Sequence, residues 1–351
     1  MSIVLGRRAF VGAGLACAAA PLLANGRNNS SLKAPATFSG TLLLARHGRT
    51  FHRANFSMAD IERGVPVHGT TRFALGSGTK WLTSVAVLKL AEAGKLALDA
   101  PIGKYLPELP RATRENVRLE HLLSNTSGIP DLLSEALKSD PSIRTSSDPA
   151  IAMAARFGGG PLRFAPGAGF DYSPLNWVLV NAIVTRAATR PFDEALQQLV
   201  FAPLGLRTIA LANGGWEAVP QMAAAYRGAD PPIRKMDRVP AFVSASGNAV
   251  GTAEDAMRAA HSVFATRFLR PNSRAQLIKV RWPEQDYALG GRVHLIGNQE
   301  WAWEEGKVSG YRALIAQNLA RDETIVIFNN RDAEQSALAA WAESIVKTQF
   351  T

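Results

Sequence analysis

Residues 74–94, ALGSGTKWLTSVAVLKLAEAG, carry the strongest indication of both fold and chemistry in this chain of 351 residues. Within them Ser77 and Lys80 stand three positions apart, and residues i and i+3 share one face of an α-helix. The Ser77 hydroxyl and the Lys80 amine are therefore expected within hydrogen-bond reach. Free N–H groups at a helix N-terminus favour a developing oxyanion. The stretch predicts a serine hydrolase whose base is a neutral lysine, a form that burial among apolar neighbours favours.

The surroundings of Ser77 give the motif its weight, because a Ser-x-x-Lys spacing alone is weak evidence. The same spacing occurs at 30–33 (SSLK) and 344–347 (SIVK), where a helix cap with a surface lysine is the simpler interpretation. Gly76 and Gly78 permit a tight turn and a close approach to a substrate. Gly94 is expected to end a helix whose apolar face comprises Trp81, Leu82, Val85, Leu88 and Leu90.

Composition indicates a globular chain long enough for one large domain or two lobes, with 47% hydrophobic residues. The formal net charge is +10, but the basic residues are scattered, so we expect no nucleic-acid partner. The positive net charge is instead compatible with weak, non-specific attraction to anionic polymers of the cell envelope. The six histidines show no metal-binding spacing, no Gly-x-Ser-x-Gly elbow occurs, and Gly158–Gly160 lack a phosphate-loop lysine. No metal and no cofactor are expected.

The N-terminus reads as an export signal. Arg7-Arg8 precede an apolar stretch of small residues through Ala24, which is typical of a twin-arginine signal peptide over 1–26. A retained anchor helix is the alternative, although the stretch is short for a membrane span. The only cysteine, Cys17, lies within it, so the mature chain would have no disulfide. We expect an exported, periplasmic or extracellular protein with a flexible lead-in at 27–37 and no stable membrane span.

The remaining pattern predicts an α+β fold. Strand-like runs lie near both chain ends, at 41–45 followed by a turn and a second strand, and again at 289–296, 311–317 and 324–328. A final helix carries Leu338, Trp341 and Ile345 on one face. Helical patterns dominate 117–230. We therefore expect an antiparallel sheet built from both chain ends and flanked by helices, with an α/β lobe at 38–116 and 231–351 and an all-helical lobe inserted at 117–230.

Six further segments follow one another in a characteristic order: 90–99 (LAEAGKLALD), 104–107 (KYLP), 122–130 (LLSNTSGIP), 164–167 (FAPG), 203–206 (PLGL) and 252–255 (TAED). With the Ser77 motif, this order resembles the serine β-lactamase and penicillin-binding-protein superfamily over about residues 38–345. The most similar branch comprises class C β-lactamases, DD-peptidases and family VIII carboxylesterases. The resemblance implies a β-lactamase/transpeptidase-like fold and an acyl-enzyme mechanism.

The second motif of that family, Tyr-x-Asn, falls on Tyr172-Ser173-Pro174. The resemblance implies that Tyr172 exchanges protons with the nucleophile and the leaving group. The family's asparagine orients the lysine and the substrate, and Pro174 has no side-chain donor. Asn176, two positions on, is a candidate for the substrate pocket. The alternative is a purely structural Tyr172.

The third motif, Lys or His, then any residue, then Gly, aligns with Glu304-Glu305-Gly306. The family's cation attracts a substrate carboxylate, whereas a glutamate would repel one by about 4 kcal/mol at contact with an effective dielectric of about 20. It would also disfavour ionisation of Tyr172. Two alternatives stay open: Lys307 or Arg312 restores the positive charge, or Glu304 is a solvated strand-end charge outside the pocket.

The resemblance also implies an oxyanion site made of backbone, with the N–H groups of Ser77 and Lys307 as donors and Gly306 allowing close approach. Gly310, whose spacing supports the register of the third motif, is a further pocket candidate together with Glu304 and Gly306.

The altered second and third motifs favour a carboxylesterase or acyltransferase acting on small uncharged esters through Ser77, Lys80 and Tyr172. One alternative is a DD-peptidase or β-lactamase acting on peptidoglycan-like or β-lactam substrates. The other is a non-catalytic module that binds envelope polymers.

Overall fold

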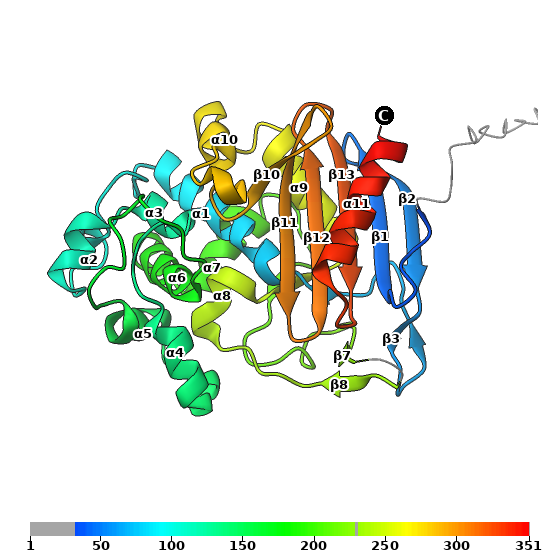
Figure 1. The fold of residues 1–351 in the computed structure, drawn as a ribbon, viewed down its shortest axis with the longest axis horizontal. Helices are drawn as coiled ribbons and strands as arrows, with labels where there is room; N and C mark the ends of the chain where they lie inside the picture. The colour runs from blue at the N-terminus through cyan, green and yellow to red at the C-terminus, as the bar shows by residue number, and fades with distance from the viewer. Residues whose placement is uncertain (1–31, 229–230, 351) are drawn as a thin grey trace, which may run out of the picture.

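A six-stranded antiparallel sheet forms the centre of the molecule in the computed structural model, which describes residues 32–228 and 231–350 (Figure 1). Strands from both chain ends pair side by side, because β1 lies between β2 and β13. The predicted antiparallel sheet and α+β class are confirmed. In spatial order the strands are β10 (Arg292–Ile296), β11 (Gln299–Val308), β12 (Tyr311–Asn318), β13 (Glu323–Asn329), β1 (Gly40–Arg46) and β2 (Arg49–Phe56).

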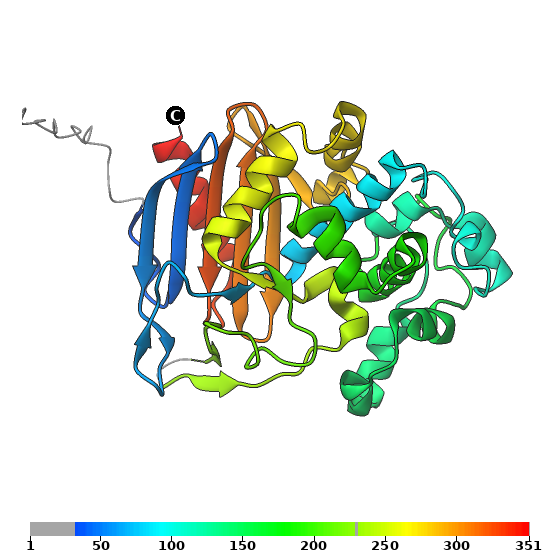
Figure 2. The same cartoon turned by 180° about the vertical axis from the view of Figure 1, so that it is seen from behind.

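Helices cover both faces of this sheet because side chains of a strand alternate between faces. Leu42 and Leu44 of β1 pack in a cluster with Leu338 and Trp341 of α11 (Gln335–Gln349). Leu43 belongs to the main core with residues of α9 (Ala253–Ala265). Figure 1 shows α11 in front of the sheet, and Figure 2 shows α9 on the opposite face. Each fully buried leucine contributes about 1.5–3 kcal/mol to folding.

Strand limits differ from the predictions where the chain bends. The run predicted at 289–296 begins to pair only at Arg292. Before it the chain makes a tight turn, in which Gly290 adopts a φ of +76° and Ala288 N donates to Gly291 O at 2.8 Å. The longest strand, β11, spans ten residues and carries the Glu304 motif within it rather than at its end. This places Glu304 inside the sheet.

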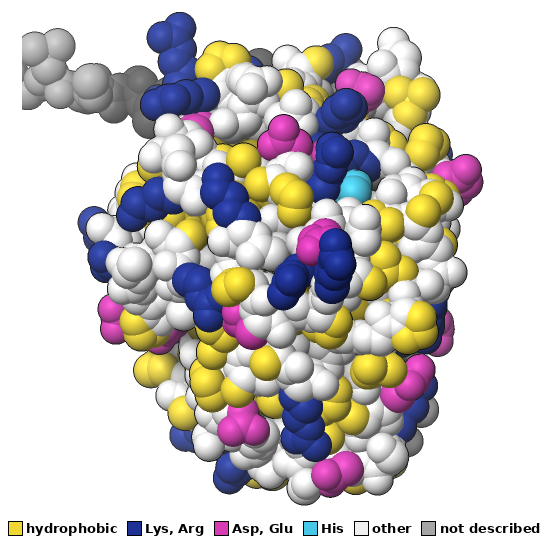
Figure 3. All heavy atoms as spheres, turned by 90° about the vertical axis from the view of Figure 1, so that its left-hand side faces the viewer, with side chains coloured by type: hydrophobic (Ala, Val, Ile, Leu, Met, Phe, Trp, Pro, Cys, Tyr) yellow, Lys and Arg dark blue, Asp and Glu magenta, His cyan; other side chains and the backbone are white. Residues whose placement is uncertain are grey.

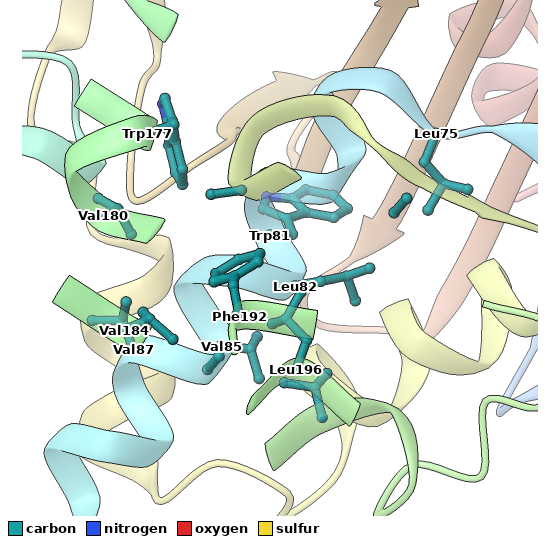
Figure 4. Close-up of a cluster of buried hydrophobic side chains, with 14 of the residues drawn as sticks. Leu75, Trp81, Leu82, Val85, Val87, Trp177, Val180, Val184, Phe192 and Leu196 are labelled. Carbon is teal, nitrogen blue, oxygen red and sulfur yellow. The ribbon is translucent and has the colours of Figure 1, made fainter. Parts of the chain in front are cut away.

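The predicted helix after Ser77 is α1 (Thr79–Glu92), which lies between the sheet and the helical part of the chain. Figure 4 shows Trp81, Leu82 and Val85 packed beside Phe192 and Leu196. The helix ends at Glu92, and the expected glycine, Gly94, follows its C-cap with a φ of +71°.

Residues 117–230 hold most of the remaining helices, together with the two short strands β6 (Ala210–Leu211) and β7 (Ala225–Arg227). β7 pairs with β8 (Ile233–Lys235), across the predicted lobe boundary, and the division into lobes stays a prediction. The other helices are α2 (Arg111–Asn116), α3 (Leu119–Leu123), α4 (Leu132–Ser139), α5 (Ala150–Phe157), α6 (Pro174–Ala188), α7 (Phe192–Leu196), α8 (Ser244–Gly247) and α10 (Pro271–Ile278).

The predicted export signal at 1–26, with Cys17, and Ser30 of the first additional Ser-x-x-Lys lie outside the described residues. Export of the chain stays a prediction. Within the described ranges, none of the helices combines the length and apolar character that crossing a bilayer requires.

Candidate active site

Ser77 lies in a single 3₁₀ turn, Gly76–Gly78, that leads directly into α1. Gly76 has a φ of +52°, which glycine adopts without strain. The Thr79 hydroxyl donates to Gly76 O at 2.7 Å and accepts from Ala249 N at 3.0 Å. The nucleophile turn is therefore fixed both to the helix that follows and to a neighbouring strand.

Lys80 reaches back to Ser77 across one turn, with 2.8 Å between Nζ and Oγ. The side chain is only 3% exposed, and Nζ donates to the backbone carbonyl of Ser246 at 3.0 Å. Nζ also lies 4.9 Å from the ring centre of Tyr172 and 5.6 Å from that of Trp177. No carboxylate of the described residues forms an ion pair with it, so this amine is oriented by a carbonyl and two aromatic faces.

Tyr172 completes the constellation, with its hydroxyl 2.8 Å from Ser77 Oγ. It precedes α6, where Ser173 caps the helix by accepting from Leu175 N at 3.2 Å. Pro174 stands in the first turn of α6, a position that needs no backbone donor. The departure from the family's asparagine therefore coincides with a well-formed helix start. The structure thus brings the hydroxyl of Tyr172, distant in sequence, to the Ser77 hydroxyl, which Lys80 contacts from within the same helical turn.

The backbone of β11 lies against the nucleophile turn. A side-chain carbon added at Gly76 would lie 2.9 Å from Lys307 N, and one added at Gly306 would lie 2.0 Å from Leu75 O. The Lys307 amide and the Ser77 turn are therefore neighbours, as two donors to a common oxyanion must be. Only glycine at position 306 permits this approach.

We expect Gly306→Ala to lower the activity by about 10²-fold or more, because β11 must move away from the Ser77 turn and one oxyanion donor is displaced. The measurement is kcat/KM for ester hydrolysis beside the thermal midpoint of unfolding. Gly297→Ala is the matched control: Gly297 lies beyond the other end of β11, has a φ of +64° and has nothing within 4 Å of an added carbon. It should lose stability but not activity, and equal activity losses in both variants would contradict the assignment.

Two predicted pocket residues are placed away from the reacting groups. Asn176 is 1% exposed, and its amide accepts from Ser127 Oγ at 2.7 Å and donates to Asn125 Oδ1 at 3.2 Å. It supports the loop beneath Tyr172. Gly310 lies in the turn between β11 and β12, where an added carbon would lie 2.9 Å from Tyr226 O. The structure does not bring Gly310 to Ser77.

Glu304 is buried in the sheet, at 1% exposure, so the alternative of a solvated strand-end charge is wrong. Its Oε2 accepts from Arg292 Nη1 at 3.2 Å, and its Oε1 has no hydrogen-bond partner among the described residues. Burial raises the pKa of Glu304 to about 8, although the charge of Arg292 opposes that shift. A carboxyl with an unusual proton affinity therefore lies close to the candidate catalytic lysine.

The side chains of Lys307 and Arg312 do not restore the missing cation. Strand alternation places Lys307 on the same face as Trp303, which packs in the α11 cluster. Arg312 pairs with Asp332 and donates through Nε to Ala333 O at 2.9 Å. Arg292, one strand further out, is the cation paired with Glu304.

Sequence reasoning missed Arg292 and the Ser246 carbonyl. Arg292 lies beside Glu304 because β10 pairs with β11, and the Arg292 side chain then reaches the neighbouring strand. A backbone acceptor such as Ser246 O has no side-chain signature in a sequence. No motif marks either residue.

Other chemistries find little support in the described part of the chain. It contains no group of His, Cys, Asp and Glu side chains placed to hold a metal ion. Lys and Arg side chains on the face shown in Figure 3 are scattered among acidic and apolar ones rather than gathered in a stripe.

Comparison with known proteins gives matches over nearly the whole described chain. A family model described as Beta-lactamase matches residues 32–349. Esterase EstB of Burkholderia gladioli is 32% identical over 267 residues, which cover 66% of this chain and 67% of EstB.

Two solved structures show the same fold. A penicillin-binding protein from Bacillus halodurans superposes with a TM-score of 0.76 at 23% identity, over 88% of this chain and 96% of its own. EstCE1, described as a hydrolase with promiscuous acyltransferase activity, superposes with a TM-score of 0.73 at 21% identity, over 88% and 93%.

Proposed function

Because this chain belongs to the Beta-lactamase family of serine hydrolases, we propose that it is a carboxylesterase or acyltransferase acting on small esters through an acyl-enzyme on Ser77. The observation that carries the proposal is the convergence of Ser77 Oγ with Lys80 Nζ and Tyr172 OH, each at 2.8 Å. A nucleophile within hydrogen-bond reach of its base is the requirement for covalent catalysis of this kind.

In the proposed reaction Ser77 Oγ attacks the ester carbonyl while its proton passes to the Lys80 amine. The N–H groups of Ser77 and Lys307 hold the resulting oxyanion. The carbon–oxygen bond to the leaving alcohol then breaks, and Tyr172 hands the alkoxide a proton that Lys80 replaces. Water, or an acceptor alcohol, repeats the sequence in reverse and frees Ser77.

A preference for uncharged esters is supported by the charges around the site. Glu304 is an acid in the sheet beside Lys80, and the positive charge of Arg292 is engaged by Glu304 Oε2 at 3.2 Å. While Glu304 is ionised, the pair carries no net charge, so Arg292 then has little attraction for a substrate carboxylate. The esterase name of the B. gladioli relative agrees with ester substrates.

The test is a panel of short p-nitrophenyl esters beside a chromogenic cephalosporin, with intact-mass detection of an acylated chain. We expect hydrolysis of the esters, a mass increase equal to the acyl group, and labelling of Ser77 by a fluorophosphonate. Added alcohol should capture the acyl group if transfer competes with hydrolysis. Hydrolysis of the cephalosporin alone would instead favour the β-lactamase alternative, and absence of labelling would favour a non-catalytic binder.

We expect Tyr172→Phe to lower kcat by about 10²- to 10⁴-fold, because a positioned proton donor is lost while the ring is retained. The side chain is 41% exposed, so the stability cost should be small. Tyr105→Phe is the matched control, since that hydroxyl accepts from Ala97 N at 2.8 Å, in another part of the fold. Burst kinetics with p-nitrophenyl acetate measure both steps, and an unchanged kcat would show Tyr172 to be structural.

A further inference from the structure

Arg292 and Glu304 form an ion pair, partly exposed at the arginine and buried at the glutamate, near Lys80 and Tyr287. The Glu304 side chain is 0% exposed, whereas that of Arg292 is 24% exposed, so solvent reaches the arginine side chain but not the carboxyl that it pairs with. Arg292 lies over the face of Tyr287, 5.3 Å from its centre, and the Tyr287 ring meets that of Tyr172 edge-on at 6.2 Å. The accessible cation is therefore one aromatic ring away from the tyrosine that contacts Ser77.

We propose that Arg292 and Glu304 together set the charge of the substrate that the site accepts. With Glu304 ionised the pair is neutral and the site takes uncharged esters; with Glu304 protonated, Arg292 is an uncompensated cation that binds a carboxylate on the substrate. The inference rests on the proposed esterase function and refines its substrate class.

The geometry allows both states of the pair. Only one Glu304 oxygen is engaged by Arg292, and Oε1 has no hydrogen-bond partner among the described residues, so it has room for a proton. Arg292 keeps its charge in either state, because a guanidinium is not deprotonated in proteins. Protonation of Glu304 therefore changes the net charge of the Arg292–Glu304 pair from zero to +1.

Several groups face Glu304 from the surrounding elements. They are Arg292 on β10, Lys80 on α1, the adjacent Glu305 on β11 and Tyr287 in the turn before β10. The residue opposite on β12 is Ile315, which does not titrate. Burial outweighs the opposing charge of Arg292 and raises the pKa of Glu304 to about 8. The preference for uncharged esters is thus expected above about pH 8 and should weaken below it.

The experiment compares 3-acetoxybenzoate with 3-acetoxybenzamide, which differ in one charge. The ratio of their kcat/KM values cancels the pH dependence of catalysis itself. Between about pH 6 and about pH 10 the wild-type ratio of anionic to neutral ester should fall by about tenfold. Glu304→Gln should give a high ratio at every pH, and Arg292→Gln a low one at every pH.

A wild-type ratio that does not change with pH, or a Glu304→Gln ratio equal to that of wild type, would overturn the proposal. The wild-type arm needs no variant to fold. Binding of benzoate and benzamide to Ser77→Ala protein, followed by NMR titration, needs no turnover. Absence of ester hydrolysis with a pH-dependent binding ratio would therefore reject the esterase function alone, and hydrolysis with a constant ratio would reject the charge pair alone.

Discussion

Ser77→Ala is expected to lower kcat for every ester in the panel by about 10⁵- to 10⁶-fold, the loss that follows removal of a nucleophilic serine from a hydrolase. The physical reason is that the acyl-enzyme no longer forms, because Lys80 and Tyr172 then have no hydroxyl to activate. The measurement is single-turnover and steady-state release of p-nitrophenol, with the intact mass followed in parallel. No acylated chain should accumulate in the variant.

The chain supplies a matched control in Ser344, which belongs to the other described Ser-x-x-Lys spacing. Ser344 is exposed on α11, where its carbonyl accepts from Thr348 Oγ1 at 2.8 Å. Ser344→Ala should therefore retain full activity. If Ser77→Ala retained hydrolysis and acylation, the nucleophile would be another residue, and this result would contradict the proposed mechanism.

The local part of the site was predictable from sequence because it depends on helix periodicity. Three positions separate Ser77 from Lys80, and that spacing alone fixes one face of a helix. Strand alternation likewise explains why Leu42 and Leu43 of β1 lie in different clusters. These relations need only the geometry of one element.

Other parts of the site depend on contacts between distant segments. The closeness of Tyr172 to Ser77 was available only through a family resemblance, since a loop before α6 has no periodicity that aims its side chain. The Arg292–Glu304 pair depends on the pairing of β10 with β11, two segments whose contact no local pattern predicts. The burial of Glu304 was likewise a property of the assembled sheet, so no charge pattern along the chain separated a buried acid from a solvated one.

Lys80→Met is the second change with a very large expected effect, a loss of about 10³- to 10⁴-fold in kcat, because methionine keeps the apolar stem but cannot accept the Ser77 proton. Little stability should be lost, since a buried amine with one carbonyl partner gives way to a side chain that fits apolar surroundings. Lys347→Met, the exposed lysine of the Ser344 spacing, is the control.

The pattern of recovery distinguishes the base from a merely structural lysine. If Lys80 takes the proton, the residual activity of Lys80→Met should rise with added small primary amines or with hydroxide concentration, while Lys347→Met shows neither dependence. If Lys80 only positions Ser77 through the Ser246 carbonyl, Lys80→Arg, which retains a donor for that carbonyl but no neutral base, should recover most of the activity. That recovery would remove the chemical step on which the acyl-enzyme proposal depends.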